Sequence, residues 1–428
     1  MSTVAFHTLG CRLNQAESDG MAEQLAARGV IAAGLTPADL VVVNTCTVTK
    51  EATKASRQTI RRAVKNNPDA TVVVVGCYAV SNPDEVAAID GVDVIVGNDE
   101  KERFAEVLGE TGAVGPLLQI GMRPPDAPRR IRANLKVQTG CDEWCTFCII
   151  PTTRGPLRSF APDDLIAEAE SRVRSGAREI ILTGVHLGKY TYDTGGDERR
   201  LVDLFARLLQ IDGLWRIRLS SILSNHLTEE VVDFIAADER MCRYLHVPLQ
   251  AGDDRVLYAM HRPYRIHEFV DAVDRAARRI PGLALATDVI VGFPGESDAA
   301  FDETLGVVER IGFSKLHVFR YSARPDTPAA GMSDEVHPDV KRERSKRLIE
   351  VGNSIRSRFL NDHLHAPLTV LVEDEREVDG AIVSAGQTSD YVRVWFEGGG
   401  VMGKMVEVEG ERVRADGLAG RLVSVTRG

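Results

Sequence analysis

Residues 138–156 read QTGCDEWCTFCIIPTTRGP, and the interpretation of the whole chain starts from this stretch. Cys141, Cys145 and Cys148 follow one another at intervals of four and three residues, with no other cysteine or histidine close by in sequence. Thiolates are soft ligands that select zinc or iron–sulfur clusters, and a structural zinc site would add a fourth protein ligand. The spacing therefore predicts a metal centre with one open coordination position. A zinc knuckle and three unrelated thiols are the alternatives to an iron–sulfur cluster.

The CxxxCxxC spacing, with Phe147 before the last cysteine, resembles the radical S-adenosylmethionine superfamily. The resemblance implies a [4Fe–4S] cluster on the three cysteines, with S-adenosylmethionine on the iron that no side chain ligates. It also implies that the reduced cluster cleaves S-adenosylmethionine to methionine and a 5′-deoxyadenosyl radical, which abstracts hydrogen from an unactivated C–H bond.

The composition, 44% hydrophobic and 27% charged residues, is that of a globular protein. The apolar runs have the length of strands, and no charged-then-apolar segment opens the chain, so we expect a cytoplasmic protein with no membrane association. Seven cysteines without a secretory signal favour reduced thiols that act as ligands over a disulfide framework. A formal net charge of −10 weakens an RNA-binding interpretation but leaves room for a local basic surface.

Residues 1–110 alternate between strand and helix patterns. The strands are VAFHTLG, LVVVNTC, TVVVVGC and VDVIVG, and Asn14 is a candidate N-cap for the helix after the first strand. Near-continuous valine runs with short linkers predict a parallel sheet covered on both faces. Cys11, Cys46 and Cys77 each come directly after a strand, and the carboxyl ends of parallel strands meet at one edge. We therefore predict that the three thiolates converge; the alternative for each is a small buried hydrophobic residue.

Residues 111–130 carry four prolines and are predicted to form a linker. After it a strand-then-helix unit repeats about six times, with the strands LKVQTG, EIILTG, RIRLSS, YLHVPLQ, ALATDVIVGF and KLHVFRYS. Right-handed crossovers close such a series into a full or partial barrel whose working residues lie at the carboxyl ends of the strands. The candidates for binding S-adenosylmethionine at those ends are Thr183, Gly184, Arg218, Ser220, Gln250 and Gly292.

From residue 365 onward apolar and polar residues alternate between glycine turns, which predicts a small antiparallel β-barrel. This part resembles the TRAM domain, an OB-like module for RNA, although its acidic residues outnumber its basic ones and favour a basic protein partner. The predicted fold class is thus α/β, with three domains. They are an N-terminal parallel α/β domain at 1–124, a central partial (βα)6 radical SAM barrel at 125–364 and a C-terminal barrel at 365–428.

TLGCRLNQAES at 8–18, VNTCTVT at 43–49 and VGCYA at 75–79 look like the N-terminal domain of the methylthiotransferases. This resemblance implies a second [4Fe–4S] cluster on Cys11, Cys46 and Cys77, which carries the sulfur that a second S-adenosylmethionine methylates. The TLGC-x-x-N-x-x-ES form is closest to the MtaB type and implies methylthiolation at C2 of N6-threonylcarbamoyladenosine, next to the anticodon of tRNA. Arg154 and Arg158 are candidates for contacting its carboxylate, or else ordinary loop arginines.

Other functions stay open on the sequence. A RimO-like enzyme would modify a ribosomal-protein aspartate, a MiaB-like enzyme would modify isopentenyladenosine, and a non-catalytic iron–sulfur or RNA-binding protein belongs to a different class. The expected partners are tRNA, an electron donor of the reductase or flavodoxin type and a sulfur donor. We expect a monomer.

Overall fold

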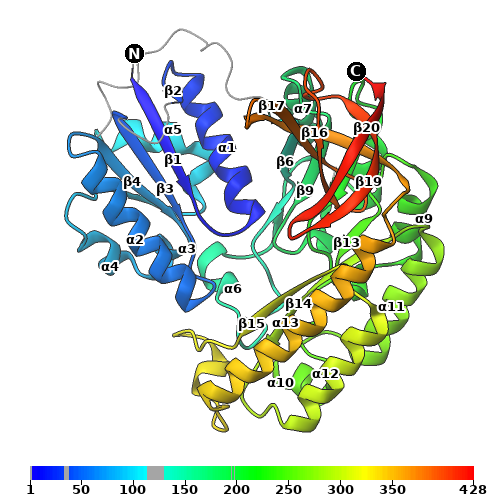
Figure 1. Cartoon of the computed structure of the whole chain (residues 1–428). Helices are drawn as coiled ribbons and strands as arrows, with labels where there is room; N and C mark the ends of the chain where they lie inside the picture. Colours follow the sequence, from blue (N-terminus) through cyan, green and yellow to red (C-terminus); the bar gives the residue numbers. More distant parts are fainter. Residues whose placement is uncertain (1, 33–37, 113–129, 194, 197) are drawn as a thin grey trace. The chain divides into compact units, whose positions relative to one another are not determined.

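The computed structural model describes residues 2–32, 38–112, 130–193, 195–196 and 198–428 (Figure 1). The chain forms two compact units, and we describe each by itself. The first unit contains Met1–Arg129, Gln138–Arg158 and Ser322–Ala330, and the second contains Arg130–Val137, Ser159–Tyr321 and Gly331–Gly428. The cysteine-rich stretch at 138–156 is thus part of the first unit, together with the N-terminal cysteines.

The first unit is built on a parallel five-stranded sheet in the order β2-β1-β3-β4-β5. Its elements are β1 (Thr3–Thr8), α1 (Arg12–Ala26), β2 (Ile31–Ala32), β3 (Leu40–Thr45), α2 (Lys50–Asn66), β4 (Thr71–Gly76), α3 (Cys77–Ser81), α4 (Pro83–Ala87), β5 (Val94–Val96), η1 (Glu100–Arg103), α5 (Phe104–Glu110), β7 (Gln138–Thr139) and α6 (Ile150–Arg154). The four predicted strands are present, and the two-residue β2 is an addition that no pattern indicated.

The valine runs are buried on both faces because successive side chains of a strand point to opposite sides. Val42 and Val73 pack with side chains of α1 and α5, whereas Val41 and Val74 pack with those of α2, α3 and α4. Figure 1 shows these helices on the two sides of the sheet. The predicted two-sided cover is therefore confirmed, and it leaves the carboxyl ends of the strands as the place where cysteines can gather.

The second unit contains six parallel barrel strands: β6 (Arg132–Lys136), β9 (Glu179–Thr183), β12 (Arg216–Leu219), β13 (Tyr244–His246), β14 (Ala284–Val291) and β15 (Lys315–Arg320). They form two three-stranded sheets, β12-β9-β6 and β13-β14-β15, which are joined by single parallel bridges between Ile217 and Met241 and between Ser221 and His246. The predicted partial (βα)6 barrel is confirmed.

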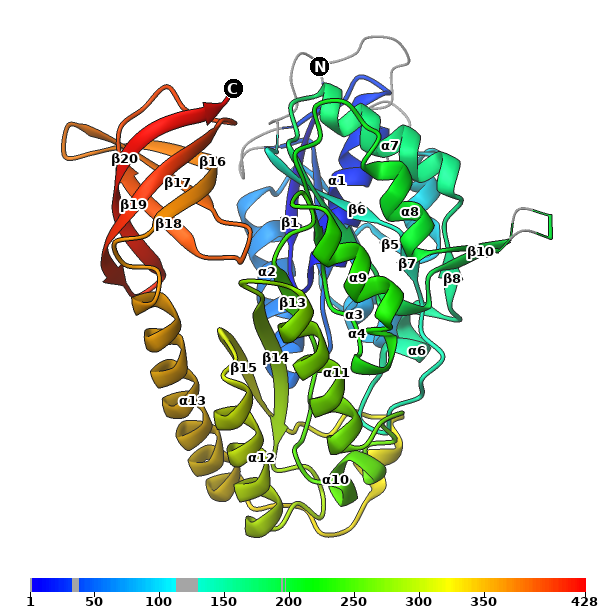
Figure 2. The ribbon, with the colours of Figure 1, turned by 90° about the vertical axis from the view of Figure 1, so that its right-hand side faces the viewer.

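The helices of the second unit follow the strands (Figure 2). They are α7 (Pro162–Arg174), α8 (Leu201–Leu208), α9 (Glu229–Ala237), α10 (Asp254–Ala259), α11 (Ile266–Arg279), α12 (Asp298–Ile311) and α13 (Pro338–Asn361), with η2 (Leu187–Lys189), η3 (Ser224–His226) and the hairpin of β10 (Thr191–Asp193) and β11 (Glu198–Arg200) in the loops. β8 (Arg158–Ser159) spans a sequence boundary between the units, and all but the last residue of η4 (Pro328–Gly331) belong to the first unit. Within the described ranges, no helix combines the length and the apolar content needed to cross a membrane.

A closed five-stranded barrel follows α13 and belongs to the second unit (Figure 2). Its strands are β16 (Pro367–Val378), β17 (Ala381–Gln387), β18 (Arg393–Glu397), β19 (Met405–Arg414) and β20 (Gly417–Arg427), in the closed order β16-β17-β18-β20-β19. All neighbouring pairs are antiparallel except β18 and β20, which are parallel. An odd ring cannot alternate strand direction all the way round, so closure requires at least one parallel pair.

The predicted domain boundaries relate to these elements in different ways. The boundary at 364/365 falls in the short link between α13 and β16, whereas the boundary at 124/125 and most of the predicted linker lie outside the described residues. The division into three domains stays a prediction, because the two compact units cut across the first boundary.

Candidate functional site

The first cysteine triplet lies at the carboxyl ends of β1, β3 and β4. Cys11 occupies the N-cap position of α1, Cys46 directly follows β3 and Cys77 begins α3. The three thiols are close enough to interact electrostatically: burial raises the pKa of Cys46 to about 11, and the nearby sulfurs of Cys77 and Cys11 add to the rise. Three soft donors therefore gather at one edge of the sheet, as the strand pattern indicated.

Asn14 does not cap α1, which corrects the prediction. Its side chain is 1% exposed, and its amide donates to the carbonyl oxygens of Leu9 at 2.8 Å and Thr45 at 2.9 Å. Because these carbonyls precede Cys11 and Cys46, the asparagine ties two cysteine loops together. A capping role would have used the same side chain on the amides of its own helix.

Glycines next to the cysteines are functional residues that the sequence reasoning missed. Gly10 has a φ of +91°, and a Cβ there would lie 2.8 Å from both Cβ and Sγ of Cys46. Gly76 has a φ of +99°, and a Cβ there would lie 2.4 Å from the carbonyl oxygen of Thr45. Both positions need the left-handed backbone and the missing side chain of glycine. The Gly-Cys dipeptides at 10–11 and 76–77 were the available signal.

A buried polar network lies beside the first triplet. The side chains of Arg154, Lys101 and Glu17 are only 1–2% exposed. Arg154 donates to both carboxylate oxygens of Glu17, at 2.8 and 3.3 Å, and to Oδ1 of Asn14 at 2.6 Å. Lys101 donates to Glu17 at 2.7 Å and to Oδ1 of Asn44 at 3.0 Å. The network brings α6, which follows the second cysteine triplet, against α1, which follows Cys11.

The contact of Arg154 with the substrate stays a prediction, and the structure gives the present partners of its side chain. The guanidinium is buried and donates hydrogen bonds to Glu17 and Asn14. Burial works against the charged form, but Glu17 and the thiols of Cys77 and Cys11 outweigh it, so the pKa of Arg154 is raised. Arg158, in contrast, is half exposed and forms an ion pair of 2.6 Å with Glu102.

A second buried arginine lies near Cys46. Arg324 donates to the carbonyl oxygens of Thr47 and Thr49 and to the hydroxyl of Thr53, all within the loop and helix after Cys46. Its Nε is buried without a hydrogen-bond partner among the described residues. Arg324, the first residue of the RPDTPAA segment, thus holds the loop after Cys46 in place, and its Nε remains available as a donor.

The second triplet is held in a compact loop of the same unit. Cys145 is buried, and its carbonyl accepts the backbone N–H of Cys148 at 2.9 Å, while the N–H of Cys141 donates to the carbonyl of Gly155 at 3.3 Å. Gly140 has a φ of +71°, and a Cβ there would overlap the carbonyl of Pro156. Burial raises the pKa of Cys141, and the thiol of Cys145 contributes to the rise.

The other predicted residues lie at the carboxyl ends of the barrel strands of the second unit. Ser220 follows β12 and its Oγ is buried without a partner in the described structure, whereas the hydroxyl of Thr183 at the end of β9 donates to the carbonyl of Leu135 at 3.1 Å. Gln250 has a φ of +66° and is fixed by backbone hydrogen bonds to Asp288 and Ile290. Gly184 directly follows β9.

Gly292, after β14, has a φ of +72°, and a Cβ there would lie 2.3 Å from Cγ of Lys341. Its N–H donates to Glu296 at 2.7 Å. Packing and backbone conformation therefore require this glycine whether or not it contacts a cofactor.

Arg218 is placed differently from the prediction. Its side chain is 1% exposed, forms an ion pair of 2.7 Å with Glu179 and donates to the carbonyl oxygens of Ser389 and Thr388 in the C-terminal barrel. Arg132 forms an ion pair of 2.9 Å with the same carboxylate. Arg218 thus ties β12 to Glu179 of β9 and to residues 388–389 of the C-terminal barrel, and its contact with S-adenosylmethionine stays a prediction.

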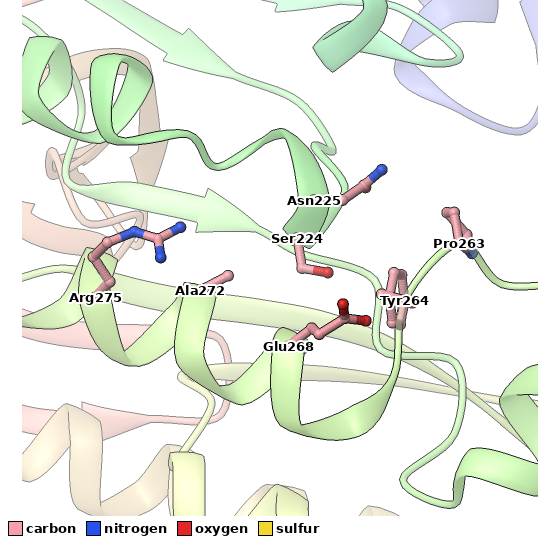
Figure 3. A pocket seen from close by; sticks show the side chains of 7 residues that line it. All are labelled: Ser224, Asn225, Pro263, Tyr264, Glu268, Ala272 and Arg275. Carbon is pink, nitrogen blue, oxygen red and sulfur yellow. The ribbon is translucent and has the colours of Figure 1, made fainter.

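A small polar pocket of about 180 Å³ lies between η3 and α11 in the second unit (Figure 3). Its lining includes Ser224, Glu268 and Arg275, and neither Oγ of Ser224 nor Nε of Arg275 has a hydrogen-bond partner in the described part of the chain. The residues predicted from the sequence do not line this pocket.

Comparisons with known proteins match both parts of the chain. Residues 3–97 match the model described as uncharacterized protein family UPF0004, and residues 135–308 match that of the radical SAM superfamily. Threonylcarbamoyladenosine tRNA methylthiotransferase MtaB of Bacillus subtilis is 38% identical over 96% of this chain and 94% of its own length. The Aquifex aeolicus protein of the same name is 35% identical over 95% of this chain and 99% of its own length. The tRNA-2-methylthio-N(6)-dimethylallyladenosine synthase of Novosphingobium aromaticivorans is 35% identical over 98% of this chain and 97% of its own length.

Solved structures share the fold at low sequence identity. The radical S-adenosylmethionine methyltransferase TsrM from Kitasatospora setae superimposes with a TM-score of 0.56 and 15% identity over 77% of each chain. The cobalamin-dependent S-adenosylmethionine radical enzyme OxsB gives a TM-score of 0.52 and 12% identity over 83% of this chain and 56% of its own.

Proposed function

The chain belongs to the methylthiotransferase family of radical S-adenosylmethionine enzymes, and we propose that it methylthiolates C2 of N6-threonylcarbamoyladenosine next to the anticodon of tRNA. The observation that carries the proposal is the pair of three-cysteine sets within one compact unit, in a chain that matches relatives named for this reaction along its whole length.

The residues of both triplets fit iron–sulfur clusters. Each set offers three thiols, which are the donors that such clusters prefer. At the first triplet, Gly10 and Gly76 have no side chain that would push the cysteine loops apart. Nε of Arg324 is buried without a partner among the described residues, and an anionic group could accept its hydrogen bond. We propose two [4Fe–4S] clusters, of which the one on Cys141, Cys145 and Cys148 supplies the electron that cleaves S-adenosylmethionine.

We further propose that Ser220, Gln250 and the backbone at Thr183, Gly184 and Gly292 bind S-adenosylmethionine. The buried and unpartnered hydroxyl of Ser220 supports this role, because a buried polar atom without a partner is costly unless a ligand satisfies it. The left-handed conformation of Gln250 supports it too, because backbone strain in a non-glycine residue persists mainly where the surroundings hold it for function.

Contact with tRNA is proposed for the TRAM-like barrel despite its acidic composition. Three arginines lie against the ring of Trp395: Arg376 and Arg393 at 4.5 Å from the ring centre and Arg414 at 5.5 Å. Arg393 forms an ion pair of 3.3 Å with Asp374 and Arg414 one of 3.6 Å with Asp416, whereas Arg376 is exposed and is our candidate for a phosphate contact. The half-exposed Arg158 is our candidate for the carboxylate of the threonylcarbamoyl group.

The reaction needs an electron and a sulfur atom from outside the chain. We propose a reductase or flavodoxin-type protein as the electron donor, and a separate sulfur donor for the first cluster. Because tRNA is the proposed substrate, we place the enzyme in the cytoplasm, as a monomer.

The test is mass spectrometry of tRNA nucleosides from the host with and without the gene. In the strain without the gene, we expect the 2-methylthio form of threonylcarbamoyladenosine to disappear and threonylcarbamoyladenosine itself to accumulate. Accumulation of isopentenyladenosine instead would assign the enzyme to the dimethylallyladenosine substrate, and an unchanged nucleoside profile would overturn a tRNA substrate. In parallel, Cys141→Ala should abolish cleavage of S-adenosylmethionine by the reduced, reconstituted protein.

A further inference from the structure

The buried network beside the first triplet connects the helix after Cys148 with the helix after Cys11 through a charged side chain. Arg154 lies six residues after Cys148, at the end of α6, yet its guanidinium reaches Glu17 and Asn14 in α1, just after Cys11. Asn98 reinforces the arrangement, because its amide donates to the carbonyl of Thr153 at 2.7 Å and lies 3.9 Å from Sγ of Cys77. A permanent positive charge that arrives from the second cysteine loop is thus fixed beside the first triplet.

The network holds two basic side chains and one acid. Arg154 and Lys101 share the carboxylate of Glu17, and all three are almost fully buried. Burial lowers the pKa of Lys101, whereas the pKa of Arg154 is raised, so Arg154 is the permanent charge of the network. Burying a charge that lacks a counter-charge costs several kcal/mol, so such a group is ordinarily paired. The sulfurs of the triplet lie close to this network, because Asn98 contacts both Sγ of Cys77 at 3.9 Å and the carbonyl of Thr153, the residue before Arg154, and Cys77 and Cys11 interact electrostatically with Arg154.

A [4Fe–4S] cluster on three thiolates would provide that counter-charge. An oxidised core with two positive charges and three thiolates leaves one net negative charge, and reduction adds a second. A nearby positive charge stabilises the reduced form more than the oxidised form, and so it raises the reduction potential of the cluster. Arginine suits this role because its guanidinium keeps its charge at every accessible pH.

We propose that Arg154, held in place by Glu17, is a positioning residue that sets the reduction potential of the cluster on Cys11, Cys46 and Cys77. The inference rests on the proposed function insofar as that function puts a cluster on the first triplet. It gives Arg154 a role on the auxiliary centre, distinct from the substrate contact that its position in the sequence suggested.

The experiment is a redox titration that is monitored by electron paramagnetic resonance. It uses the whole chain with Cys141, Cys145 and Cys148 changed to alanine, so that only the first triplet can hold a cluster. Two variants are made in this background, Arg154→Gln and Glu17→Gln. Loss of the positive charge should lower the midpoint potential, and loss of the negative charge should raise it. Shifts of opposite sign are the signature of an electrostatic role, since a loosened structure would shift both variants in the same direction.

Arg158→Gln is the matched control. It removes an arginine from the same loop that is half exposed and paired with Glu102, where solvent screens its charge. Its midpoint potential should equal that of the parent protein, whatever its effect on tRNA modification. Equal potentials in Arg154→Gln and Arg158→Gln, or shifts of one sign in Arg154→Gln and Glu17→Gln, would overturn the proposal.

The two hypotheses fail in distinguishable ways. A parent protein that binds no iron at the first triplet overturns the proposed function and this inference together, before any variant is compared. If the first triplet binds a cluster but deletion of the unaltered gene leaves the tRNA nucleosides of the host unchanged, the proposed substrate is refuted and the potential measurement stays valid.

Discussion

At the scale of single residues, the first triplet depends as much on glycine as on cysteine. Gly10 and Gly76 precede Cys11 and Cys77 with left-handed backbone, and each lies where a side chain would collide with the neighbouring cysteine loop. The positions of the ligands are thus fixed by close approach of backbone, because the three strand ends are hydrogen-bonded neighbours of one sheet.

Gly10→Ala should therefore push the loop of Cys11 away from Cys46. The added Cβ would lie 2.8 Å from Cys46, and the left-handed conformation costs an L-residue about 1–2 kcal/mol. We expect the variant to lose the iron of the first triplet while the second triplet keeps its own, so that iron and sulfide per chain fall by about half after anaerobic reconstitution.

Gly20→Ala is the control for this prediction, because Gly20 lies in α1 and a Cβ there would meet nothing within 4 Å. Alanine in a helix interior stabilises by roughly 0.5–1 kcal/mol relative to glycine. An iron content in Gly10→Ala equal to that of Gly20→Ala would contradict the argument.

The sequence indicated the six cysteines, but it did not indicate the partners of the arginines near them. Arg154 and Glu17 are 137 residues apart in the chain, and no local pattern records which distant carboxylate a loop arginine will meet. The same limit explains Arg218, whose place at the end of a strand suggested a cofactor but whose acceptors belong to the C-terminal barrel.

At the scale of elements, three neighbouring strands send charges to one buried cluster. β6 contributes Arg132, β9 contributes Glu179 and β12 contributes Arg218, and the two arginines share the carboxylate. Burial would raise the pKa of Glu179, but the two arginines outweigh it and hold the pKa well below its usual range.

Glu179→Gln should destabilise the second unit, because it leaves two buried arginines without their counter-charge. Removing one partner from a buried ion pair costs about 3–5 kcal/mol, whereas an exposed pair costs a few tenths. Denaturant unfolding should show the large loss for Glu179→Gln and little change for Glu168→Gln, whose carboxylate is 38% exposed in an i,i+4 pair. Equal midpoints in the two variants would refute the assignment.

The pH dependence of this difference has a defined sign. Since the pKa of Glu179 is lower in the folded state than in the unfolded state, its stabilising effect is complete above the unfolded value of about 4.3 and is lost as the pH falls below it. The stability gap between the parent protein and Glu179→Gln should therefore be constant near neutrality and shrink in acid.

Most elements follow from periodicity, and the exceptions have physical reasons. Buried valine runs predict strands well, because a parallel sheet needs apolar residues on both faces. β2 and the β10–β11 hairpin were missed, since two or three residues are too few to show a period. The parallel pairing of β18 with β20 follows from closing an odd ring, which no single strand reveals.

At the scale of the whole molecule, the net charge of −10 and the acidic residues of the C-terminal barrel have to be weighed against single exposed bases. Charge acts locally, within a Debye length of about 8–10 Å, so an exposed arginine such as Arg376 on an acidic barrel can still meet a phosphate. An acidic total therefore does not decide against an RNA partner.

Arg376→Gln should weaken tRNA binding without affecting either cluster. Arg376 is exposed beside Trp395, so a lost phosphate contact should lower the affinity several-fold and reduce the slope of log affinity against log salt by roughly one. Filter binding over a range of salt concentrations measures both quantities. Arg310→Gln, which removes an exposed arginine from α12, is the control, and an identical salt slope in the two variants would exclude Arg376 from the interface.

The closed ring of five strands also determines how late in synthesis the second unit can finish folding. β20 follows the other four barrel strands in the chain and pairs with both β18 and β19, so the barrel cannot close until residues 417–427 have been synthesised. Until then Arg218 lacks the stable carbonyl acceptors of residues 388 and 389, whereas the first unit's sheet is complete by residue 96. A chain that stops before β20 would therefore contain all six cysteines of the two triplets but an open C-terminal barrel, with two strand edges exposed to unwanted pairing.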